Sequence, residues 1–398
     1  MRDAILVVNA GSSSLKFQIF TSDREGALAV ISRGQFEGLG VAPHFVALDP
    51  EGHVLSEQRW EDGALADHAA AFVFFETWLN GNLSDVALIA AGHRVVHGGF
   101  RFEAPALVTP EVLAELQRIS YLAPLHQPHA VACIAALTAI KPELPQIACF
   151  DTAFHRNHPP VADRFAIPFE YYQAGVRRYG FHGLSYEFIA RRLRQLAPDL
   201  AAGRVVVAHL GNGSSLCAIR NGVSIDSTMG FTALDGMPMG TRCGSIDPGV
   251  LLYFLRQRGM SVDDVEAMLY KKSGLLGLSG ISSDMRLLLS ADSDHAREAV
   301  DYFVYHVVRE VGALAAALGG LDGLVFTAGI GEHASQIHTR VVEALAWLGL
   351  AIDPVAHANG ALRISPDDHN PSVWVIPTDE ERMIARHTLD LLAGLAPA

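Results

Sequence analysis

Cysteine is scarce in this chain of 398 residues, which has four, and no two of them are spaced as C-x-x-C. That scarcity excludes a disulfide framework and a thiolate zinc site, and it favours a reducing compartment. Long hydrophobic runs are also missing. The first residues hold too few apolar side chains for a secretory signal. The most apolar stretch, roughly 311–331, contains Asp322 and several glycines, which predicts a buried helix and strand instead of a membrane span. We therefore expect a cytoplasmic protein.

Basic residues are few as well. Lys and Arg number 30 against 43 Asp and Glu, a net charge of −13, and this balance speaks against nucleic acid as a partner. Charged residues make up only 18% of the chain and hydrophobic residues 50%, which excludes a disordered protein. The length and this composition suffice for two hydrophobic cores, so we expect two domains.

Several common catalytic signatures are absent. No Gly-Lys pair occurs, so there is no Walker A loop, and the H-R-D and D-F-G segments of protein kinases are missing. The sequence also has no G-x-S-x-G nucleophile elbow and no H-E-x-x-H zinc motif. Any nucleotide or acyl chemistry must therefore use another arrangement of residues.

Alternating strands and helices are legible from the pattern. The apolar run 5–8, the turn 9–14 and the two-residue alternation from Leu15 predict a β-hairpin with a serine-rich tip. Thr109 followed by Pro110 predicts a helix N-terminus. Helical spacing from Asp294 to Leu318 stops at a pair of glycines, and a further helix is expected from about 378 to 392.

Two echoes within the chain indicate an internal duplication. The segment 205–216 repeats the logic of the opening strand and turn, and Ser13-Ser14-Leu15 matches Ser214-Ser215-Leu216. A second echo relates 88–92 to 325–329. Together they predict two copies of one α/β unit, with two similar loops facing a shared cleft.

Three loops rich in Gly and Ser (9–16, 209–215 and 327–333) are candidates for phosphate binding, because tight turns expose backbone N–H groups at close range. Lys16 would add a positive charge. The third loop matches G-x-G-x-x-A over 329–334, the dinucleotide fingerprint. A nicotinamide-dependent oxidoreductase is thus one alternative, although that fingerprint usually lies in the first βα turn of its domain.

The histidine pairs are weak evidence for a functional site, whereas the arginines flanked by glycine are stronger evidence. The pairs His93/His97 and His126/His129 have metal-ligand spacing, but among 18 histidines such pairs arise by accident, and we expect structural or general polar roles for them. Arginines flanked by glycine, by contrast, are unlikely choices for a core. They occur in the segments 92–94, 177–183 and 240–244, and predict a cluster that binds carboxylate or phosphoryl oxygens in bidentate fashion.

Eight segments, met in order along the whole chain, resemble the motifs of the acetokinase family. The two signature segments are Asn9-Ala10-Gly11-Ser12-Ser13-Ser14-Leu15-Lys16-Phe17 and Met239-Gly240-Thr241-Arg242-Cys243-Gly244. The others are 92–99, 150–155, 177–183, 209–215, 326–332 and 378–381. The resemblance implies an α/β protein with two duplicated ribonuclease-H-like (actin-like ATPase) domains around a central cleft. It places a first domain at 1–150, a second at 151–381, and a C-terminal helix (about 382–398) packing back on the first.

The resemblance also implies an activity: reversible transfer of a phosphoryl group from ATP to acetate, giving acetyl phosphate and ADP by direct in-line transfer. It implies Mg²⁺ as the metal, a homodimer, and neither nucleic acid nor membrane as partner. Propionate or butyrate kinase is the alternative within the family. A non-kinase ATPase of the actin and Hsp70 type is the alternative of another class, and would yield no acyl hydroxamate from ATP and acetate.

Residue roles follow from the same resemblance. Asp151, Arg94, His182 and Arg242 would be catalytic, and Arg94 would bind the substrate carboxylate with Val96, Leu125 and Pro238 around its alkyl chain. Asn9 and Glu380 would hold Mg²⁺. The nucleotide and its phosphates would contact Ser12, Ser14, Lys16, His209, Leu210, Gly211, Asn212, Gly213, Asp284, Met285, Arg286, Gly329, Ile330, Gly331, Glu332 and His333.

Two points qualify the resemblance. A short carboxylic acid is already ionised at pH 7, so a general base has no proton to remove, and we expect Asp151 to orient Arg94, Arg242 or a metal-bound water instead. The chain also departs from the family pattern at five positions. It has Gln127 for Asn, Leu184 for Thr, Tyr186 for His, Ser245 for Asp and His333 for Asn. Substrate and nucleotide preference are therefore less determined by the motifs than the reaction class.

Overall fold

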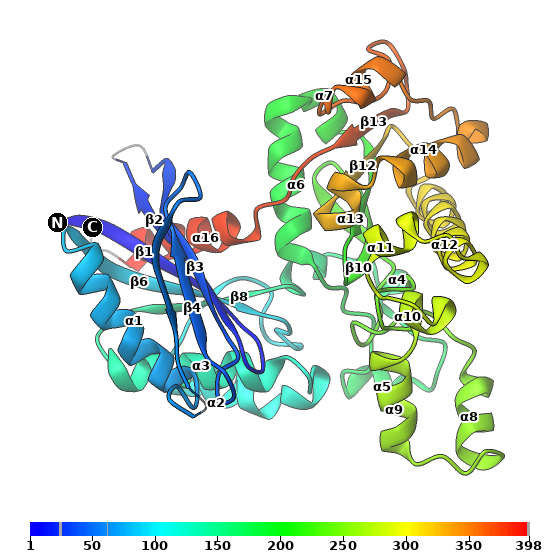
Figure 1. Cartoon of the computed structure of the whole chain (residues 1–398). Coiled ribbons are helices and arrows are strands. Elements are labelled where there is room, and N and C mark those ends of the chain that lie inside the picture. The colour runs from blue at the N-terminus through cyan, green and yellow to red at the C-terminus, as the bar shows by residue number, and fades with distance from the viewer. Residues whose placement is uncertain (24–25, 62, 396–398) are drawn as a thin grey trace. The chain divides into compact units, whose positions relative to one another are not determined.

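The computed structural model describes residues 1–23, 26–61 and 63–395. These divide into two compact units: unit 1 comprises Met1–Ala153 and Asp379–Ala398, and unit 2 comprises Phe154–Thr378. Each unit is built on a mixed β-sheet with helices on both faces (Figure 1). None of the helices in the described ranges is long and apolar enough to cross a membrane.

Unit 1 contains an eight-stranded sheet in the order β5-β4-β3-β2-β1-β6-β8-β7. Its strands are β1 (Arg2–Ala10), β2 (Leu15–Ser22), β3 (Leu28–Glu37), β4 (His44–Leu48), β5 (Val54–Arg59), β6 (Val86–Val95), β7 (Ala106–Leu107) and β8 (Gln146–Phe150). Its helices are α1 (His68–Asn82), α2 (Pro110–Arg118), η1 (Ser120–Leu122), α3 (Gln127–Ile140) and α16 (Glu380–Leu395).

The sheet of unit 1 is covered on both faces because β1 alternates buried side chains toward each. Ala4, Leu6 and Val8 point to the core formed with α1 and α3. The other face, at β1, β6 and β8, is covered by α16, which returns from the end of the chain. The predicted C-terminal helix is present and lies against this unit, and its last three residues, 396–398, lie outside the described ranges.

Unit 2 contains a five-stranded sheet in the order β11-β10-β9-β12-β13. Its strands are β9 (Arg204–Leu210), β10 (Ser214–Arg220), β11 (Val223–Ser227), β12 (Gly323–Thr327) and β13 (Ser372–Val375). Its helices are α4 (Pro160–Asp163), α5 (Phe169–Gln173), α6 (Gly183–Leu196), α7 (Pro198–Ala201), α8 (Pro248–Arg256), α9 (Val262–Lys271), α10 (Gly274–Ser279), α11 (Met285–Ser290), α12 (Asp294–Leu318), α13 (Ala328–His333), α14 (Ser335–Ala344), η3 (Ala346–Leu348) and α15 (Pro354–Ala358). The short η2 (Ala153–His155) spans the boundary between the units.

The two sheets share one topology. In unit 1, β3-β2-β1 run antiparallel and β1-β6-β8 run parallel. In unit 2, β11-β10-β9 run antiparallel and β9-β12-β13 run parallel. The same five-strand order and the same directions occur twice, which is what a duplicated ribonuclease-H-like domain requires.

The sequence echoes fall on corresponding elements but out of register. Leu15 pairs with Ala10 at the base of the first hairpin, and Ser214 pairs with Leu210 at the base of the second. Leu15 therefore corresponds to Ser214, two residues from the position that the sequence match gave it. The second echo likewise falls on β6 and β12 in a shifted register.

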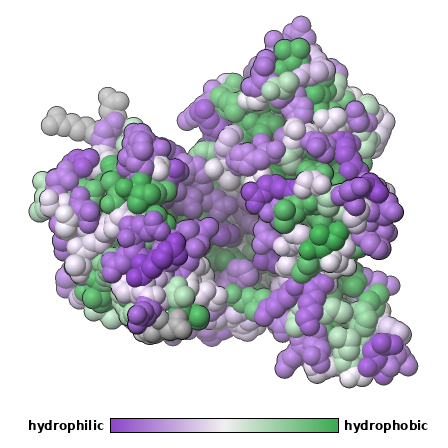
Figure 2. Space-filling model, viewed as in Figure 1, coloured by the Kyte–Doolittle hydropathy of each residue, from purple (hydrophilic) through white to green (hydrophobic). Residues whose placement is uncertain are grey.

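Several local predictions are confirmed. The serine-rich turn is the tip of the β1–β2 hairpin. Thr109 caps α2, its side chain accepting from the Val112 N–H, with Pro110 at the first helical position. The long helix α12 runs from Asp294 to Leu318 and ends where Gly319 adopts a left-handed conformation (φ 73°). Hydrophilic and apolar residues are interspersed over the face shown in Figure 2, as a chain with so few charges must arrange them.

Candidate active site

A glycine in β6 sets the position of helix α16. A Cβ on Gly92 would lie 2.6 Å from the Ile384 side chain and even closer to the Thr388 hydroxyl, so only glycine lets the helix approach this strand. Arg94 follows two residues later and shares the same face of the strand. On α16, Glu380 is one turn before Ile384. The close packing at Gly92 therefore places Glu380 beside Arg94.

Arg94 forms the centre of a charged cluster in unit 1. Its Nε donates to both carboxylate oxygens of Asp151 at 3.2 Å, and its Nη2 donates to Oδ2 at 2.7 Å. Glu380 lies on the other side, with its Oε2 3.6 Å from Nε. The Asp151 side chain is 1% exposed, whereas Arg94 keeps 23% of its side chain exposed. The arginine is thus anchored from within the protein and open at its outer edge.

The charges in this cluster shift the pKa values of its members. Burial by itself lowers the pKa of Arg94, but the neighbouring charges of Asp151 and Glu380 outweigh it and raise that pKa above its usual range. Burial raises the pKa of Glu381, and the like charge of Glu380 raises it further. Glu381 lies in the motif 378–381, but the resemblance implied no role for it.

The oxygen ligands at this place fit Mg²⁺. Carboxylates and an amide oxygen are what the ion prefers, and it usually keeps several waters and takes only one or two protein carboxylates. Glu380 and Glu381 are adjacent acidic groups that repel each other. Among the described residues, the sole group of three His, Cys, Asp or Glu side chains whose ligand atoms lie close enough to hold a metal is Asp49, Glu51 and His53, so the cluster around Arg94 is not a ready-made cage. The arrangement therefore suits a hydrated cation that substrate oxygens help to bind.

Hydrogen bonds hold the backbone of the serine-rich turn in unit 1, while side chains in and beside the turn stay exposed. Gly11 accepts from the buried ring of His68 on α1 (3.1 Å), and the Ser13 carbonyl accepts from the Leu39 N–H (3.0 Å). Ser12 and Lys16 are exposed, and Ser14 is half-buried. Asn9, at the end of β1, pairs with Lys16 across the hairpin. The structure thus brings Asn9 and Lys16 together in a braced turn.

Val96 follows directly on β6, and Gln127 fixes the backbone after it. The Gln127 side chain donates to the His97 carbonyl (2.9 Å) and accepts from the His97 N–H (3.2 Å), so it pairs with the main chain as a neighbouring strand would. Gln127 is fully buried. Leu125, two residues before it, is 37% exposed. The departure from Asn at position 127 therefore has a structural role next to Val96.

His182 occupies a special position in unit 2. It caps α6 with a left-handed backbone (φ 56°), which costs a residue with a side chain about 1–2 kcal/mol. Its ring stacks on that of His209 with centroids 4.1 Å apart. Nδ1 of His182 lies 2.8 Å from the Ser215 hydroxyl, and Nδ1 of His209 lies 2.9 Å from the Ser185 hydroxyl. The two predicted histidines are therefore brought together as one stacked pair.

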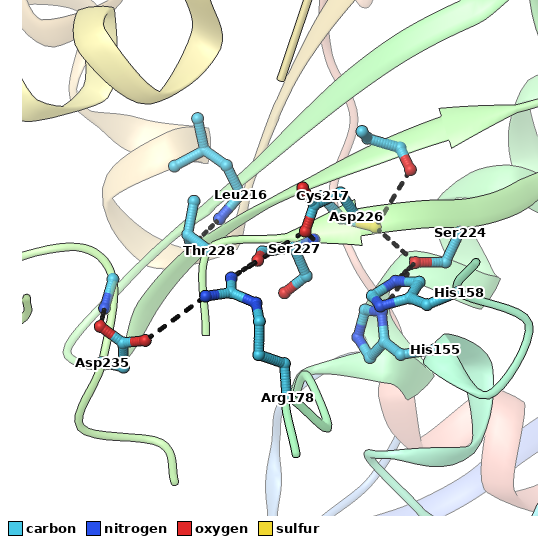
Figure 3. A network of polar contacts seen from close by, with 12 residues as sticks. His155, His158, Arg178, Leu216, Cys217, Ser224, Asp226, Ser227, Thr228 and Asp235 are labelled. Atoms are coloured by element: carbon cyan, nitrogen blue, oxygen red, sulfur yellow. Dashed lines mark hydrogen bonds and ion pairs between the residues drawn. The ribbon is translucent and has the colours of Figure 1, made fainter. Parts of the chain in front are cut away.

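A buried network holds the carbonyl that precedes His182, and Figure 3 shows His155, His158 and Ser224 of this network. His155 lies 2.9 Å from the Phe181 carbonyl through Nε2 and 2.8 Å from the Ser224 hydroxyl through Nδ1. His158 approaches the same hydroxyl at 2.7 Å. Burial lowers the pKa of His155 to about 4 and that of His158 to about 2, so both rings are neutral. This network fixes the backbone from which His182 projects.

The loop that contains Pro238 and Arg242 is held in place by ion pairs and hydrogen bonds. Arg178 contacts Asp235 (3.7 Å) and donates to the Ser227 carbonyl (2.6 Å), as Figure 3 shows. Ser245 donates to Asp235 at 2.7 Å, so an aspartate here would face a second carboxylate. Arg242 donates to the Ala233 carbonyl at 3.0 Å. Pro238 is buried.

The second glycine loop closes a tight turn between β9 and β10. The Ser214 hydroxyl donates to the Gly211 carbonyl at 2.9 Å, and the Gly240 N–H donates to the Asn212 carbonyl at 3.1 Å. Asn212 is exposed, whereas Leu210 belongs to the core. Gly213 lies against His182, whose Nε2 would be 3.2 Å from a Cβ there. The turn and the stacked histidines thus form one surface.

The third glycine segment is not a hairpin turn but the start of a helix. Strand β12 leads directly into α13, and Ala328 between them has a left-handed backbone (φ 66°). Glu332 accepts from the N–H groups of Ala328 (2.9 Å) and Thr378 (3.1 Å). Its carboxylate therefore braces this segment from within. Gly329 and His333 are exposed, Ile330 is half-buried, and Gly331 is buried with its carbonyl 2.8 Å from His338.

The segment predicted to contact adenosine caps α11. Asp284 accepts from the Arg286 N–H at 2.8 Å and pairs with its guanidinium at 2.6 Å. The hydrogen bond from Arg286 lowers the pKa of Asp284 to about 2. The Arg286 side chain is 88% exposed, whereas Met285 is buried in the core. The side chains of Asp284 and Arg286 are accessible to a ligand, and that of Met285 is not.

The first histidine pair, His93 and His97, has the structural role that was expected for it. His93 is 2% exposed and contacts Gln146 at 2.8 Å, and burial lowers its pKa to about 4. His97 accepts from the Gly99 N–H through Nδ1 (2.8 Å).

The glycine segment 329–334 follows the fourth strand of its unit in chain order, whereas a dinucleotide fingerprint usually lies in the first βα turn of its domain.

Sequence comparison relates the whole chain to one family. The model of the acetokinase family matches residues 4–386. The acetate kinase of Rhodopseudomonas palustris (strain ATCC BAA-98 / CGA009) is 54% identical over 99% of this chain and 100% of its own length. The acetate kinase of Nitrobacter hamburgensis is 52% identical over 98% of this chain and 96% of its own.

Solved structures agree with these relatives. A propionate kinase from Francisella tularensis superimposes with a TM-score of 0.89 at 36% identity, covering 97% of this chain and 98% of its own. The acetate kinase of Porphyromonas gingivalis gives a TM-score of 0.88 at 34% identity, covering 98% of this chain and all of its own. The matched segments span both units and every motif of the candidate site, and the chain belongs to the acetokinase family.

Proposed function

We propose that this chain transfers the γ-phosphoryl group of ATP to the carboxylate of acetate, reversibly and in line, giving acetyl phosphate and ADP. Membership of the acetokinase family makes the chain an enzyme, an ATP-dependent carboxylate kinase. The alternatives of another class, a non-kinase ATPase and a nicotinamide-dependent oxidoreductase, do not agree with that membership. Which carboxylate it takes and which residues act on it are proposals.

The observation that supports a carboxylate acceptor best is the state of Arg94. Asp151 engages Nε and Nη2, and within the described ranges Nη1 has no protein acceptor. A guanidinium fixed on one edge and open on the other can bind a second carboxylate in a defined orientation. A clamp or filament protein that only binds nucleotide has no need of such a group. Val96 and Leu125 would line the space for the methyl group.

Phosphoryl transfer needs positioning and neutralisation of the equatorial oxygens more than covalent help from the protein. In unit 2, His182 and Arg242 would donate to those oxygens, and Pro238 would contact the alkyl chain of the substrate. His209 and the loop Leu210–Gly213 would hold phosphate. Asp284, Met285, Arg286 and the segment Gly329–His333 would contact the adenosine, with Glu332 and Met285 acting from within the protein. In unit 1, Ser12, Ser14 and Lys16 would face the transferred group.

Asn9 and Glu380 would bind Mg²⁺, which when bound neutralises phosphate charge and orients the leaving group. The cluster around Arg94 carries more negative than positive charge, since Asp151, Glu380 and Glu381 surround a single arginine. A cation offsets that excess. Asp151 would orient Arg94 and would not act as a base.

The test is the hydroxamate assay, in which hydroxylamine traps acyl phosphate formed from ATP and a carboxylate. We expect kcat/KM to be highest for acetate, with propionate and butyrate lower. One methylene changes binding by only about 1–3 kcal/mol, so the three acids must be compared directly. The solved propionate kinase at 36% identity is the reason to test propionate first. A higher kcat/KM for propionate would overturn the choice of acetate.

Two further proposals concern the context of the enzyme. We propose that it is a homodimer, which light scattering at several concentrations would test. We also propose that it works in the cytoplasm, where ATP is available and where its four cysteines, all free thiols and three of them buried, would stay reduced. Fractionation of the cells that produce it tests the second point.

A further inference from the structure

The His182 ring is held by the hydroxyl of Ser215, which is held in turn by the phenol of Tyr186. Its Nδ1 lies 2.8 Å from the Ser215 hydroxyl, and that hydroxyl lies 2.5 Å from the phenol of Tyr186. Ser215 and Tyr186 are each fully buried. Ser215 comes from β10, and Tyr186 lies in the first turn of α6, four residues after His182. The ring is therefore held by a side chain from β10, and that side chain is held by a residue of α6.

The protons that each group can donate indicate which group is the donor in each of these hydrogen bonds. A serine hydroxyl and a phenol each have one proton to donate. Because a phenol is the stronger donor of the two, the favoured arrangement has Tyr186 donating to Ser215 and Ser215 donating its own proton to Nδ1 of His182. A neutral imidazole that accepts at Nδ1 has its proton on Nε2.

The Nε2 edge of the ring faces the glycine turn. Nε2 would be 3.2 Å from a Cβ on Gly213, so a side chain at that position would cover it. On the opposite side the ring is packed against His209, with an angle of 17° between the two planes. The proton on Nε2 is thus presented at the turn that we propose to hold phosphate.

We propose that Ser215 and Tyr186 are positioning residues for phosphoryl transfer, which fix the His182 ring with its proton on Nε2 and directed to the loop Gly211–Gly213. This inference rests on the proposed function, because it gives His182 the task of donating to the transferred phosphoryl group. It also gives a reason for Tyr186, which stands where the family pattern has a histidine. A phenol always has a proton to donate, whereas an imidazole nitrogen donates only in one tautomer or when charged.

Kinetics test the coupling between the residues. Ser215→Ala is expected to lower kcat at least tenfold, with the KM values for ATP and acetate within about twofold of wild type, because the ring loses its orientation and not its ligands. Tyr186→Phe is expected to lower kcat severalfold. Tyr179→Phe is the matched control, since it removes another phenol, which donates to the Gly175 carbonyl, and it is expected to leave kcat unchanged.

A double variant separates positioning from a general structural role. In a His182→Asn background, which keeps a residue that tolerates the left-handed backbone, Ser215→Ala should cost no further activity. If Ser215→Ala lowers kcat by the same factor in that background as in wild type, Ser215 does not act through His182 and the proposal is wrong.

A measurement without turnover tests the tautomer itself. Imidazole ¹⁵N spectra of the wild-type enzyme, with the His182 signal identified by its loss in His182→Asn, should show Nε2 protonated and Nδ1 unprotonated. In Ser215→Ala this signature should change to a mixture of tautomers. A wild-type ring with its proton on Nδ1 would overturn the proposal. A wild-type enzyme with the expected signature but without hydroxamate formation would overturn the proposed function and leave the orientation of His182 standing.

Discussion

The guanidinium of Arg94 donates to Asp151 through two nitrogens, with Nη2 2.7 Å from Oδ2 and Nε 3.2 Å from both oxygens. The carboxylate is 1% exposed, and the arginine turns its remaining edge outward. Since the pairing occupies both oxygens of Asp151, this carboxylate is placed to orient an arginine and poorly placed to remove a proton.

Asp151→Asn should therefore lower kcat/KM for acetate by about a hundredfold or more, because it removes the buried charged partner that orients Arg94 and leaves Glu380 beside it at 3.6 Å. Breaking a buried pair costs about 3–5 kcal/mol. The loss should be the same from pH 6 to pH 9, since acetate is ionised over that whole range. The measurement is kcat/KM against pH for both enzymes. A loss confined to low pH, with the Mg²⁺ dependence unchanged, would show that Asp151 acts as a base.

Gly92→Ala should destabilise unit 1 by about 1–3 kcal/mol, the usual cost of overpacking, because the added methyl meets Ile384 and Thr388 on α16. It should also raise the KM for acetate, since Glu380 and Arg94 depend on the same contact. Urea unfolding and steady-state kinetics measure the two effects. Gly81→Ala is the control. Gly81 lies in α1, and a Cβ there would have no neighbour within 4 Å, so the variant should stabilise the protein by about 0.5–1 kcal/mol.

Glu381→Gln should change stability with pH. Burial and the like charge of Glu380 raise the pKa of Glu381 in the folded protein, so the folded state binds its proton more tightly than the unfolded state. That contribution to stability is complete below the unfolded pKa and is lost as pH rises through the folded pKa. The variant should therefore melt above wild type at pH 7–8 and equal to it near pH 4. A wild-type melting temperature above that of the variant at pH 8, in the absence of Mg²⁺, would contradict this.

A matched carboxylate checks the sign of that effect. The hydrogen bond from Thr109 lowers the pKa of Glu111, so its contribution to stability is present at neutral pH and disappears as pH falls. Glu111→Gln should melt below wild type at pH 7 and approach it in acid. The two variants thus have opposite signs under one protocol of thermal unfolding.

Glu332 should act through its oxygen and not through its charge. Glu332→Gln keeps an acceptor for the N–H groups of Ala328 and Thr378 and should retain most of the activity. Glu332→Ala leaves both groups unsatisfied, at about 1–3 kcal/mol each, and should raise the KM for ATP. Calorimetric titration with ADP measures the same loss without turnover. Equal damage by both variants would mean that the carboxylate itself contacts the nucleotide or metal.

Local structure was predictable where the signal is local. Thr109 and Pro110 start a helix wherever they occur before an apolar pattern, and Gly319 ends one because it adopts a left-handed conformation at little cost. The internal duplication was found on the right strands, but its register was wrong. A short apolar strand followed by glycine and serine fits several alignments equally well, whereas hydrogen-bonded pairing such as Leu210 with Ser214 allows one.

The candidate site, like the fold, was predictable from the sequence only in part. The motifs made Arg94, His182 and Glu380 candidates by residue type, since cationic, hydrogen-bonding and metal-binding groups suit phosphoryl transfer to a carboxylate. Sequence did not identify Ser215, Tyr186 or Glu381 as partners, because their roles depend on which side chains meet in the interior. It also could not show that Met285 is buried, that Glu332 braces the backbone, or that Ser245 accommodates Asp235.

By itself the sequence determined the reaction class, the α/β elements and the functional groups available, because these depend on residue identity and on short-range periodicity. Tertiary structure decided which of those groups are anchored and which are exposed. The clearest case is Arg94, whose orientation depends on a strand, a helix from the other end of the chain, and a glycine that lets them touch. Such contacts join residues almost three hundred positions apart, and only folding brings them together.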